Sequence, residues 1–247
     1  MIYLLTLNWD TSDMLIRMYK SAIELAEKEF NFIIVDNGSI KDEYDKIVNY
    51  DFKNCTILRN DKNLGFAAGN NIGLQQIQEK DCSIVFINSD IIIKERHWDL
   101  KFQDMLDQPN VGVVGCAYHV LSWDKTGHFK INQQITETSE SEGVQGAFFG
   151  VKKCNLDKIF QKDLYWFDEN FKYAQYEEID LQWRVQYLGL KCLWTPIDHS
   201  HDHHHSATKA HRYRICDEIQ NEKQFKENAE KNRQLLLKKH KIFFNSK

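Results

Sequence analysis

The sequence predicts an α/β fold with a mostly parallel central sheet and helices on both faces. In the first half of the chain, short apolar runs of strand length alternate with segments whose apolar residues recur at helical spacing. Such alternation is typical of parallel sheets that helices cover on both sides. The composition agrees, because 42% hydrophobic residues can form a buried core and only two prolines interrupt the 247 residues.

Four strands and three helices are expected in the first half. The strands are expected at residues 2–7, 32–35, 55–58 and 83–87, and the helices at 12–28, in the polar segment after residue 39, and at 66–78. Thr11, Ser12 or Asp13 can cap the first helix. Because ligands bind at the carboxyl ends of parallel strands, residues 6–8, 36–39 and 88–90 are expected along one functional edge.

The second half of the chain has a different pattern. Strands are expected at 111–120, 143–151 and 191–195, a hairpin or mobile loop at 121–142, and helices at 177–188 and 212–239. The sequence has no internal repeat and no linker-like stretch. We therefore expect one domain over residues 1–211, with halves at 1–95 and 96–211, followed by a C-terminal helical extension at 212–247.

Charge and cysteine usage limit the function classes. The formal net charge of −4 and the pI near 6.2 argue against a nucleic-acid partner, whose phosphates require basic residues. Six scattered cysteines, none in a C-x-x-C pair, indicate reduced thiols. The first apolar run is too short for a signal segment and no later run is long enough to span a membrane, so a cytoplasmic protein is expected.

Two polar turns follow predicted strands. In Asn88-Ser89-Asp90, the carboxylate can reach a divalent cation that shares oxygen ligands with substrate phosphates. In Asp36-Asn37-Gly38-Ser39, the Asp36 carboxylate can accept a hydrogen bond from the imide N–H of uracil or thymine, or from a ribose hydroxyl. Backbone capping within a turn explains each motif equally simply.

Residues 60–73 join a turn to a helix rich in small residues. Small residues let the backbone approach a ligand, and a helix N-terminus favours the negative charge of a diphosphate. No G-x-G-x-x-G fingerprint follows the first strand, which disfavours a dinucleotide-binding dehydrogenase. Close helix–sheet packing explains Ala67, Ala68 and Gly73 but leaves three polar residues unexplained, namely Asn63, Asn70 and Asn71.

Three carboxylates open the helix expected at 177–188, and these are Glu177, Glu178 and Asp180. Mutual repulsion and partial burial raise a carboxyl pKa toward neutrality, as a general base requires. Alternatively, these residues only cap a solvated helix, whose dipole stabilises negative charge at its N-terminus.

Histidines are concentrated at residues 199–205, in the string H-S-H-D-H-H-H. Histidine is the commonest transition-metal ligand. Hydrolases of the metallo-β-lactamase type use H-x-H-x-D-H, and this string is one residue short before its Asp. A metal-dependent hydrolase built on residues 199–205 is therefore an alternative function, and a polar surface loop is the simplest structural explanation.

Together these segments resemble the family 2 glycosyltransferases with the GT-A fold, especially the rhamnosyltransferase-like bacterial members. The matching motifs occur in the family's order over about residues 2–206. They are Leu7-Asn8-Trp9, Val35-Asp36-Asn37-Gly38-Ser39, Asn63-x-Gly65-Phe66-Ala67-x-Gly69-Asn70-Asn71-x-Gly73, Asn88-Ser89-Asp90, Gly146-Ala147-Phe148, Phe167-Asp168-Glu169-x-Phe171, Glu177-Glu178-x-Asp180-Leu181 and the stretch from Pro196 to His201.

The resemblance implies a nucleotide-sugar-binding first half, 1–95, and an acceptor-binding second half, 96–211. Asp90 matches the last Asp of the D-x-D motif that binds Mn²⁺ or Mg²⁺, and His201 or His203 matches the family's late histidine. Glu178 matches the catalytic base, whose site Glu177 and Asp180 would organise. The donor, a UDP-, dTDP- or GDP-sugar, would be bound by Thr6, Asn8, Asp36, Asn63, Gly65, Asn70, Asn88 and Ser89.

Two positions depart from the family pattern. Asn88 replaces the first Asp of D-x-D, so metal affinity rests on fewer ligands, and Glu178 replaces the more usual Asp.

The activity implied is sugar transfer to a hydroxyl of a saccharide or lipid-linked acceptor, by a single displacement that inverts the anomeric centre. A catalytically inactive sugar-nucleotide-binding module is a further alternative. For the C-terminal helix, peripheral membrane contact through its basic end competes with simple packing on the domain.

Overall fold

A central sheet of eight strands forms the frame of the described part of the chain, in the order β3-β2-β1-β4-β10-β6-β11-β9. The computed structural model describes residues 1–117, 120–201, 216, 219–241 and 244. Four neighbouring strands run parallel, which confirms the predicted α/β class. They are β1 (Ile2–Asn8), β2 (Asn31–Asp36), β3 (Cys55–Arg59) and β4 (Ser83–Ile87).

The second half of the chain extends the same sheet. β10 (Phe148–Lys152) lies antiparallel between β4 and β6 (Val111–Gly115). Next to β6 lies β11 (Lys191–Trp194) in parallel, and the short β9 (Ser139–Glu140) closes that edge. Because the hydrogen-bonded ladder continues from β4 into β10, the two halves share one sheet.

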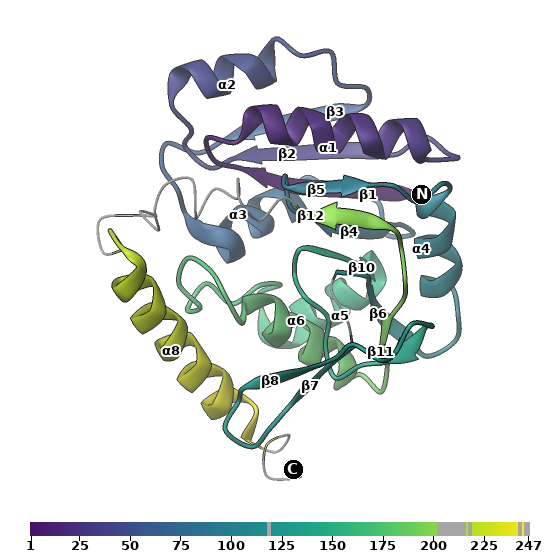
Figure 1. The fold of residues 1–247 in the computed structure, drawn as a ribbon, viewed down its shortest axis with the longest axis vertical. Helices are drawn as coiled ribbons and strands as arrows, with labels where there is room; N and C mark the ends of the chain where they lie inside the picture. The colour runs from purple at the N-terminus through teal and green to yellow at the C-terminus, as the bar shows by residue number, and fades with distance from the viewer. Residues whose placement is uncertain (118–119, 202–215, 217–218, 242–243, 245–247) are drawn as a thin grey trace.

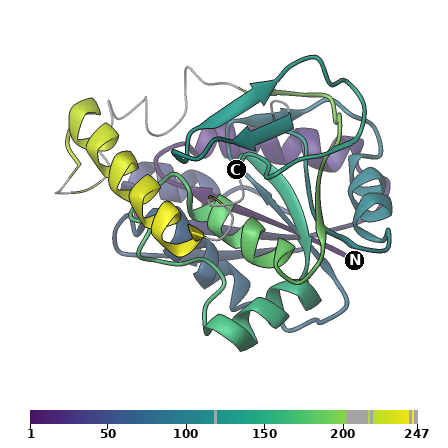
Figure 2. The same cartoon turned by 90° about the horizontal axis from the view of Figure 1, so that it is seen from below.

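Helices cover both faces of the sheet (Figures 1 and 2). Successive residues of β2 enter opposite hydrophobic clusters, as the alternation of side chains along a strand requires. The cluster on one face includes residues of α1 and α4, and the cluster on the other includes residues of α3, α5 and α6. These helices are α1 (Ser12–Leu25), α3 (Gly65–Leu74), α4 (Trp98–Leu106), α5 (Lys153–Asp163) and α6 (Glu177–Gln186), and α2 (Lys41–Val48) packs on α1.

Several predicted boundaries differ from the structure in the second half. The strand expected at 111–120 ends at Gly115, and a separate β7 (Val120–Trp123) forms a hairpin with β8 (Phe129–Asn132). Five described elements were not predicted. Three are strands of only two or three residues, namely β5 (Ile91–Ile93), β9 and β12 (His199–His201), which pairs antiparallel with β5. The other two are the helices α4 and α5, although α4 has apolar residues at helical spacing, Trp98, Phe102 and Leu106.

The C-terminal helix, α8 (Glu222–Lys239), begins later than the predicted 212–239. Its start is defined by Asn221, whose side chain accepts a hydrogen bond from the backbone N–H of Gln224. Leu236 is fully buried in a cluster with Trp183 of α6, and Figure 1 shows α8 in yellow beside the β7–β8 hairpin. Among the described helices, none is long and apolar enough to cross a membrane.

Candidate active site

The carboxyl ends of β1 and β2 meet at a buried polar pair. Asn8 is paired in register with Asp36, and its Nδ2 donates to Asp36 Oδ1 over 3.0 Å and to Ser39 Oγ over 3.0 Å. Asp36 Oδ2 accepts the backbone N–H of Ser39 and lies 4.0 Å from Arg59 Nε. Both carboxylate oxygens therefore have partners within the protein, and the side chain is fully buried.

A cavity of about 210 Å³ opens beside this pair, and we call it the donor pocket after the role expected from the sequence resemblance. It brings together six of the residues predicted to bind the donor or the metal, namely Asn8, Asn63, Gly65, Asn88, Ser89 and Asp90. Asn37 lines the pocket where Asp36 was expected to, because Asp36 is turned into the buried network. Asn37 belongs to the polar turn at residues 36–39, but no ligand-binding role was predicted for it.

Besides Asp36, two predicted donor-binding residues lie outside this cavity. Thr6 is buried within β1, at 1% exposure. Asn70 is 2% exposed, and its Nδ2 donates to the carbonyl of Phe66, one turn earlier in α3. The predicted contact between Asn70 and the donor is therefore disfavoured, because the side-chain amide of Asn70 already donates a hydrogen bond within its own helix.

Asn37 fastens the N-terminus of α3 to the donor pocket. Its Nδ2 donates to Asn63 Oδ1 over 3.0 Å and to the carbonyl of Gly65 over 3.1 Å. Gly65 has a φ of +85°, and a Cβ there would lie 2.7 Å from the Cα of Tyr173. Both the positive φ and the close approach of Tyr173 require glycine at position 65. The N-terminus of α3 faces the pocket, which is the arrangement of an anion-binding site.

Asp90 has the features of a metal ligand. Its Oδ2 lies 3.0 Å from His201 Nε2, and its Oδ1 is buried with no hydrogen-bond partner among the described residues. His201 reaches this position because β12 pairs with β5, which sets it opposite Ile91. A carboxylate oxygen and an imidazole nitrogen suit Mn²⁺, and Mg²⁺ needs few protein ligands when phosphates and waters supply the rest.

Among the histidines of residues 199–205, the structure describes His199 and His201. No group of three or more His, Cys, Asp or Glu side chains arranged to hold a metal ion occurs in the described part of the chain. His199 lies on β12, where its Nδ1 bonds the carbonyl of Ile197. His203 lies outside the described residues.

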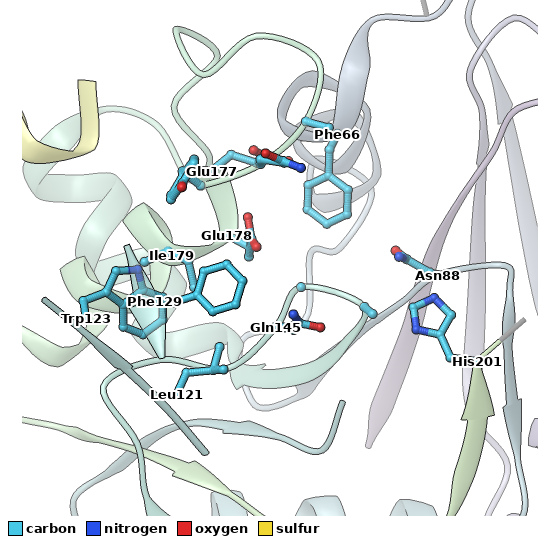
Figure 3. Close-up of a pocket in the computed structure, with 15 residues that line it drawn as sticks. Phe66, Asn88, Leu121, Trp123, Phe129, Gln145, Glu177, Glu178, Ile179 and His201 are labelled. Atoms are coloured by element: carbon cyan, nitrogen blue, oxygen red, sulfur yellow. The ribbon is translucent and has the colours of Figure 1, made fainter. Parts of the chain in front are cut away.

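A second cavity, of about 370 Å³, adjoins the first, and we call it the acceptor pocket after the role expected from the sequence resemblance. Phe66, Asn88 and Ala174 line both cavities. Figure 3 shows Glu178 between Trp123 and Phe129 on one side and Asn88 and His201 on the other. A group bound in the donor pocket would thus meet one bound beside Glu178.

The environments of Glu177 and Glu178 differ. Burial raises the pKa of Glu178 from its ordinary 4.5 to about 6, against hydrogen bonds from backbone groups that lower it. Burial and the neighbouring charge of Glu178 raise the pKa of Glu177 well above its ordinary value. Glu177 is 3% exposed, and its Oε2 has no hydrogen-bond partner among the described residues. Glu178 is therefore the carboxyl group more readily ionised near neutral pH.

Asp180 faces away from the acceptor pocket, contrary to its predicted role within the site. Its position on α6 points the side chain toward the C-terminal end of α8. There His240 Nε2 lies 2.9 Å and Lys239 Nζ lies 2.6 Å from Asp180 Oδ1. Arg184 Nε donates to its Oδ2 over 2.9 Å. Desolvation raises the pKa of Asp180, but these partners outweigh it and lower the pKa to about 2.

A family model described as glycosyl transferase family 2 matches residues 3–160, which is more than half of the chain. The chain belongs to this family. No curated protein sequence matches it.

Solved glycosyltransferase structures share the GT-A fold with this family 2 chain. The mannosyltransferase PcManGT from Pyrobaculum calidifontis, in complex with GDP-Man and Mn²⁺, superposes with a TM-score of 0.60 and 13% identity, over 80% of this chain and 55% of its own. TarS from S. aureus, residues 1–349, superposes with a TM-score of 0.57 and 15% identity, over 79% of this chain and 60% of its own. A longer TarS structure superposes with a TM-score of 0.57 and 14% identity, over 79% of this chain and 36% of its own. This chain thus spans less than two thirds of the length of each of the three structures.

In this family 2 chain, α8 supports the loop between the two pockets. Asn232 is 3% exposed, and its Nδ2 lies 3.0 to 3.1 Å from the carbonyls of Lys172, Ala174 and Gln175. Within that loop, Tyr173, Gln175 and Tyr176 have positive φ values. Three left-handed residues in four positions are costly, so the loop needs such external bonds. Asn232 was not predicted to be important, because a lone Asn in a charged helix carries no local signal.

Proposed function

We propose that the protein is an inverting glycosyltransferase that transfers a hexosyl or deoxyhexosyl group from a nucleotide sugar to an acceptor hydroxyl. The observation that carries the proposal is the position of Glu178 in a cavity that shares Phe66 and Asn88 with the donor pocket. The proposed donor is a UDP-, dTDP- or GDP-sugar. The proposed acceptor is a surface glycan or lipid-linked saccharide, so the reaction belongs to polysaccharide biosynthesis.

In this mechanism Glu178 is the general base. Its carboxylate accepts the proton of the acceptor hydroxyl while that oxygen attacks the anomeric carbon of the donor. One displacement without a covalent intermediate inverts the anomeric configuration. A base is most effective when its pKa lies near the working pH, and the pKa of about 6 at Glu178 meets that condition.

The diphosphate would lie at the N-terminus of α3, whose backbone N–H groups favour negative charge. Asp90 and His201 are the residues proposed to hold Mn²⁺ or Mg²⁺, on the strength of the unpartnered Asp90 oxygen. Such a cation, when bound, neutralises charge on the diphosphate leaving group. Asn37 and Asn63 keep the ribose side of the pocket in place through their mutual hydrogen bond.

The deciding experiment compares Glu178→Gln with Glu177→Gln. Glutamine keeps the shape of residue 178 but cannot take a proton, so turnover is expected to fall by about 10²–10⁴ while donor affinity stays the same. Glu177→Gln keeps a neutral group where a neutral carboxyl is expected, so its turnover changes far less. Near-normal turnover of Glu178→Gln would contradict the base assignment. Donor binding without any turnover in the wild type would instead favour the catalytically inactive binding module.

Cytoplasmic location and peripheral membrane contact remain proposals. A membrane contact would use the basic end of α8, where Lys238 and Lys241 are exposed. The neighbouring Lys239 and His240 already bond Asp180, and Leu236 is in the core. These contacts favour the role of α8 as a packed terminal helix.

A further inference from the structure

The acceptor pocket has two chemically different walls. The β7–β8 hairpin contributes an apolar wall that includes Leu121, Trp123 and Phe129. The carboxyls of Glu177 and Glu178 belong to the opposite, polar wall, and Figure 3 shows the Phe129 ring directed toward Glu178. A ligand that fills the space must therefore be apolar on one face and hydroxylated at its edge.

Phe129 and Trp123 contribute differently to the apolar wall. The Phe129 side chain is 46% exposed, whereas Trp123 is 4% exposed and its ring packs against Phe129 and Trp183. Of these two rings, Phe129 therefore offers the accessible aromatic face.

Charge excludes one class of acceptor from this pocket. Its described lining residues include two carboxyls and no lysine or arginine. A phosphate or carboxylate on the acceptor ring would add a further negative charge beside Glu177 and Glu178, in a site where burial strengthens repulsion. The volume of about 370 Å³ is within the range of small-ligand sites, ~300–1,000 Å³.

We propose that this pocket binds an uncharged pyranose ring, with its C–H face against Phe129 and a hydroxyl toward Glu178. Ring C–H groups carry partial positive charge and contact the negative face of an aromatic ring favourably. This inference rests on the proposed function and adds the class of acceptor to it. It assigns Phe129 as a specificity-determining residue.

The test uses saturation-transfer NMR on the full chain with Mn²⁺ replaced by diamagnetic Mg²⁺ and with UDP, GDP or dTDP present. The probes are methyl hexopyranosides and, as matched anions, the corresponding hexuronides and hexose 6-phosphates. At least one neutral pyranoside is expected to receive saturation on its C–H face, and the matched anions none. Equal or stronger binding of the anions would overturn the inference.

Phe129→Ala and Ile131→Ala form a matched pair of variants. Both residues lie on the same face of β8 with similar exposure, 46% and 42%. Of the two, Phe129 lines the pocket and Ile131 does not. Phe129→Ala is expected to weaken pyranoside binding about tenfold, Phe129→Tyr to restore it, and Ile131→Ala to leave it unchanged. Equal effects of the two alanine variants would refute the stacking contact.

Donor measurements separate this inference from the proposed function. Calorimetry with nucleotide sugars and Mg²⁺ reports the donor pocket, and slow donor hydrolysis reports transfer to water. Donor binding and hydrolysis without any neutral pyranoside signal would overturn the acceptor class and leave the transferase proposal standing. Pyranoside binding without any donor binding would overturn the transferase proposal instead.

Discussion

Gly146 lies directly against the side chain of Glu178. A Cβ at position 146 would lie 2.8 Å from Glu178 Cγ, closer than Cβ atoms approach their neighbours, and 3.2 Å from its Cδ, a tight contact. Glycine at this position therefore makes room for the carboxyl group proposed as the base. The glycine of the motif Gly146-Ala147-Phe148 is thus required by the contact with Glu178 of α6.

Gly146→Ala is expected to displace the Glu178 carboxylate and lower kcat by tenfold or more, because a displacement of about 1 Å can cost ~10² in rate. Steady-state kinetics and the melting temperature would be measured together. Gly150→Ala is the control, since its Cβ would crowd Phe102 and Leu106 in the core and not Glu178. A normal kcat for Gly146→Ala would show that the carboxylate position is uncritical.

The pH dependence of kcat/KM tests the raised pKa of Glu178, about 6. The base works ionised, so kcat/KM should be level above pH 6 and fall about tenfold per unit below it. A pKa raised on folding gives stability that is complete below 4.5 and lost as pH rises through about 6. Glu178→Gln should therefore be no less stable than the wild type at pH 8.

Melting temperatures across the same pH range exclude acid unfolding as the cause of any decline in rate. A rate profile that is flat from pH 5 to 8 would contradict the assignment of Glu178. A destabilised Glu178→Gln at pH 8 would instead favour the alternative in which the residue only caps α6.

Asp90→Asn tests the proposed cation site. The substitution keeps the size of the side chain but removes the charge, so metal-enhanced binding of a nucleoside diphosphate should be lost, with the fold intact. Calorimetry with and without Mn²⁺ measures this difference. In EDTA the variant and the wild type should bind equally, and metal-dependent affinity that survives the substitution would refute the site.

Asp180→Asn should unfold more easily because it breaks a buried ion pair. Arg184, Lys239 and His240 would lose their shared carboxylate, and removal of one partner of a buried pair costs about 3–5 kcal/mol. Chemical denaturation at pH 7 measures the change in the free energy of unfolding. Glu140→Gln is the control, since its pair with Lys191 is exposed and contributes at most about 1 kcal/mol.

The same comparison has a defined pH dependence. The pKa of Asp180 is lowered on folding, so its stabilisation is complete above the ordinary value of 3.8 and is lost as pH falls through about 2. The difference between wild type and Asp180→Asn should therefore shrink over that interval. A constant difference down to pH 2 would show that packing, and not charge, accounts for the loss.

The sequence by itself determined the α/β class and the functional edge. Side-chain alternation and helical spacing are local properties, so the first four strands were predicted within two residues at each end. Polar motifs that directly follow strands must gather at the carboxyl edge of a parallel sheet. Asn8, Asn88 and Asp90 accordingly line one pocket, although up to 82 positions separate them along the chain.

The direction of each carboxylate depended on partners that are distant in sequence. Asp36 was predicted to reach a ligand, but Asn8 and Ser39 hold it inside the sheet edge. Asp180 resembles Glu177 and Glu178 in sequence, yet it turns to His240, 60 residues later. Burial and ion pairing are set by long-range packing, and no local pattern distinguishes a carboxylate that faces a cavity from one that faces a helix.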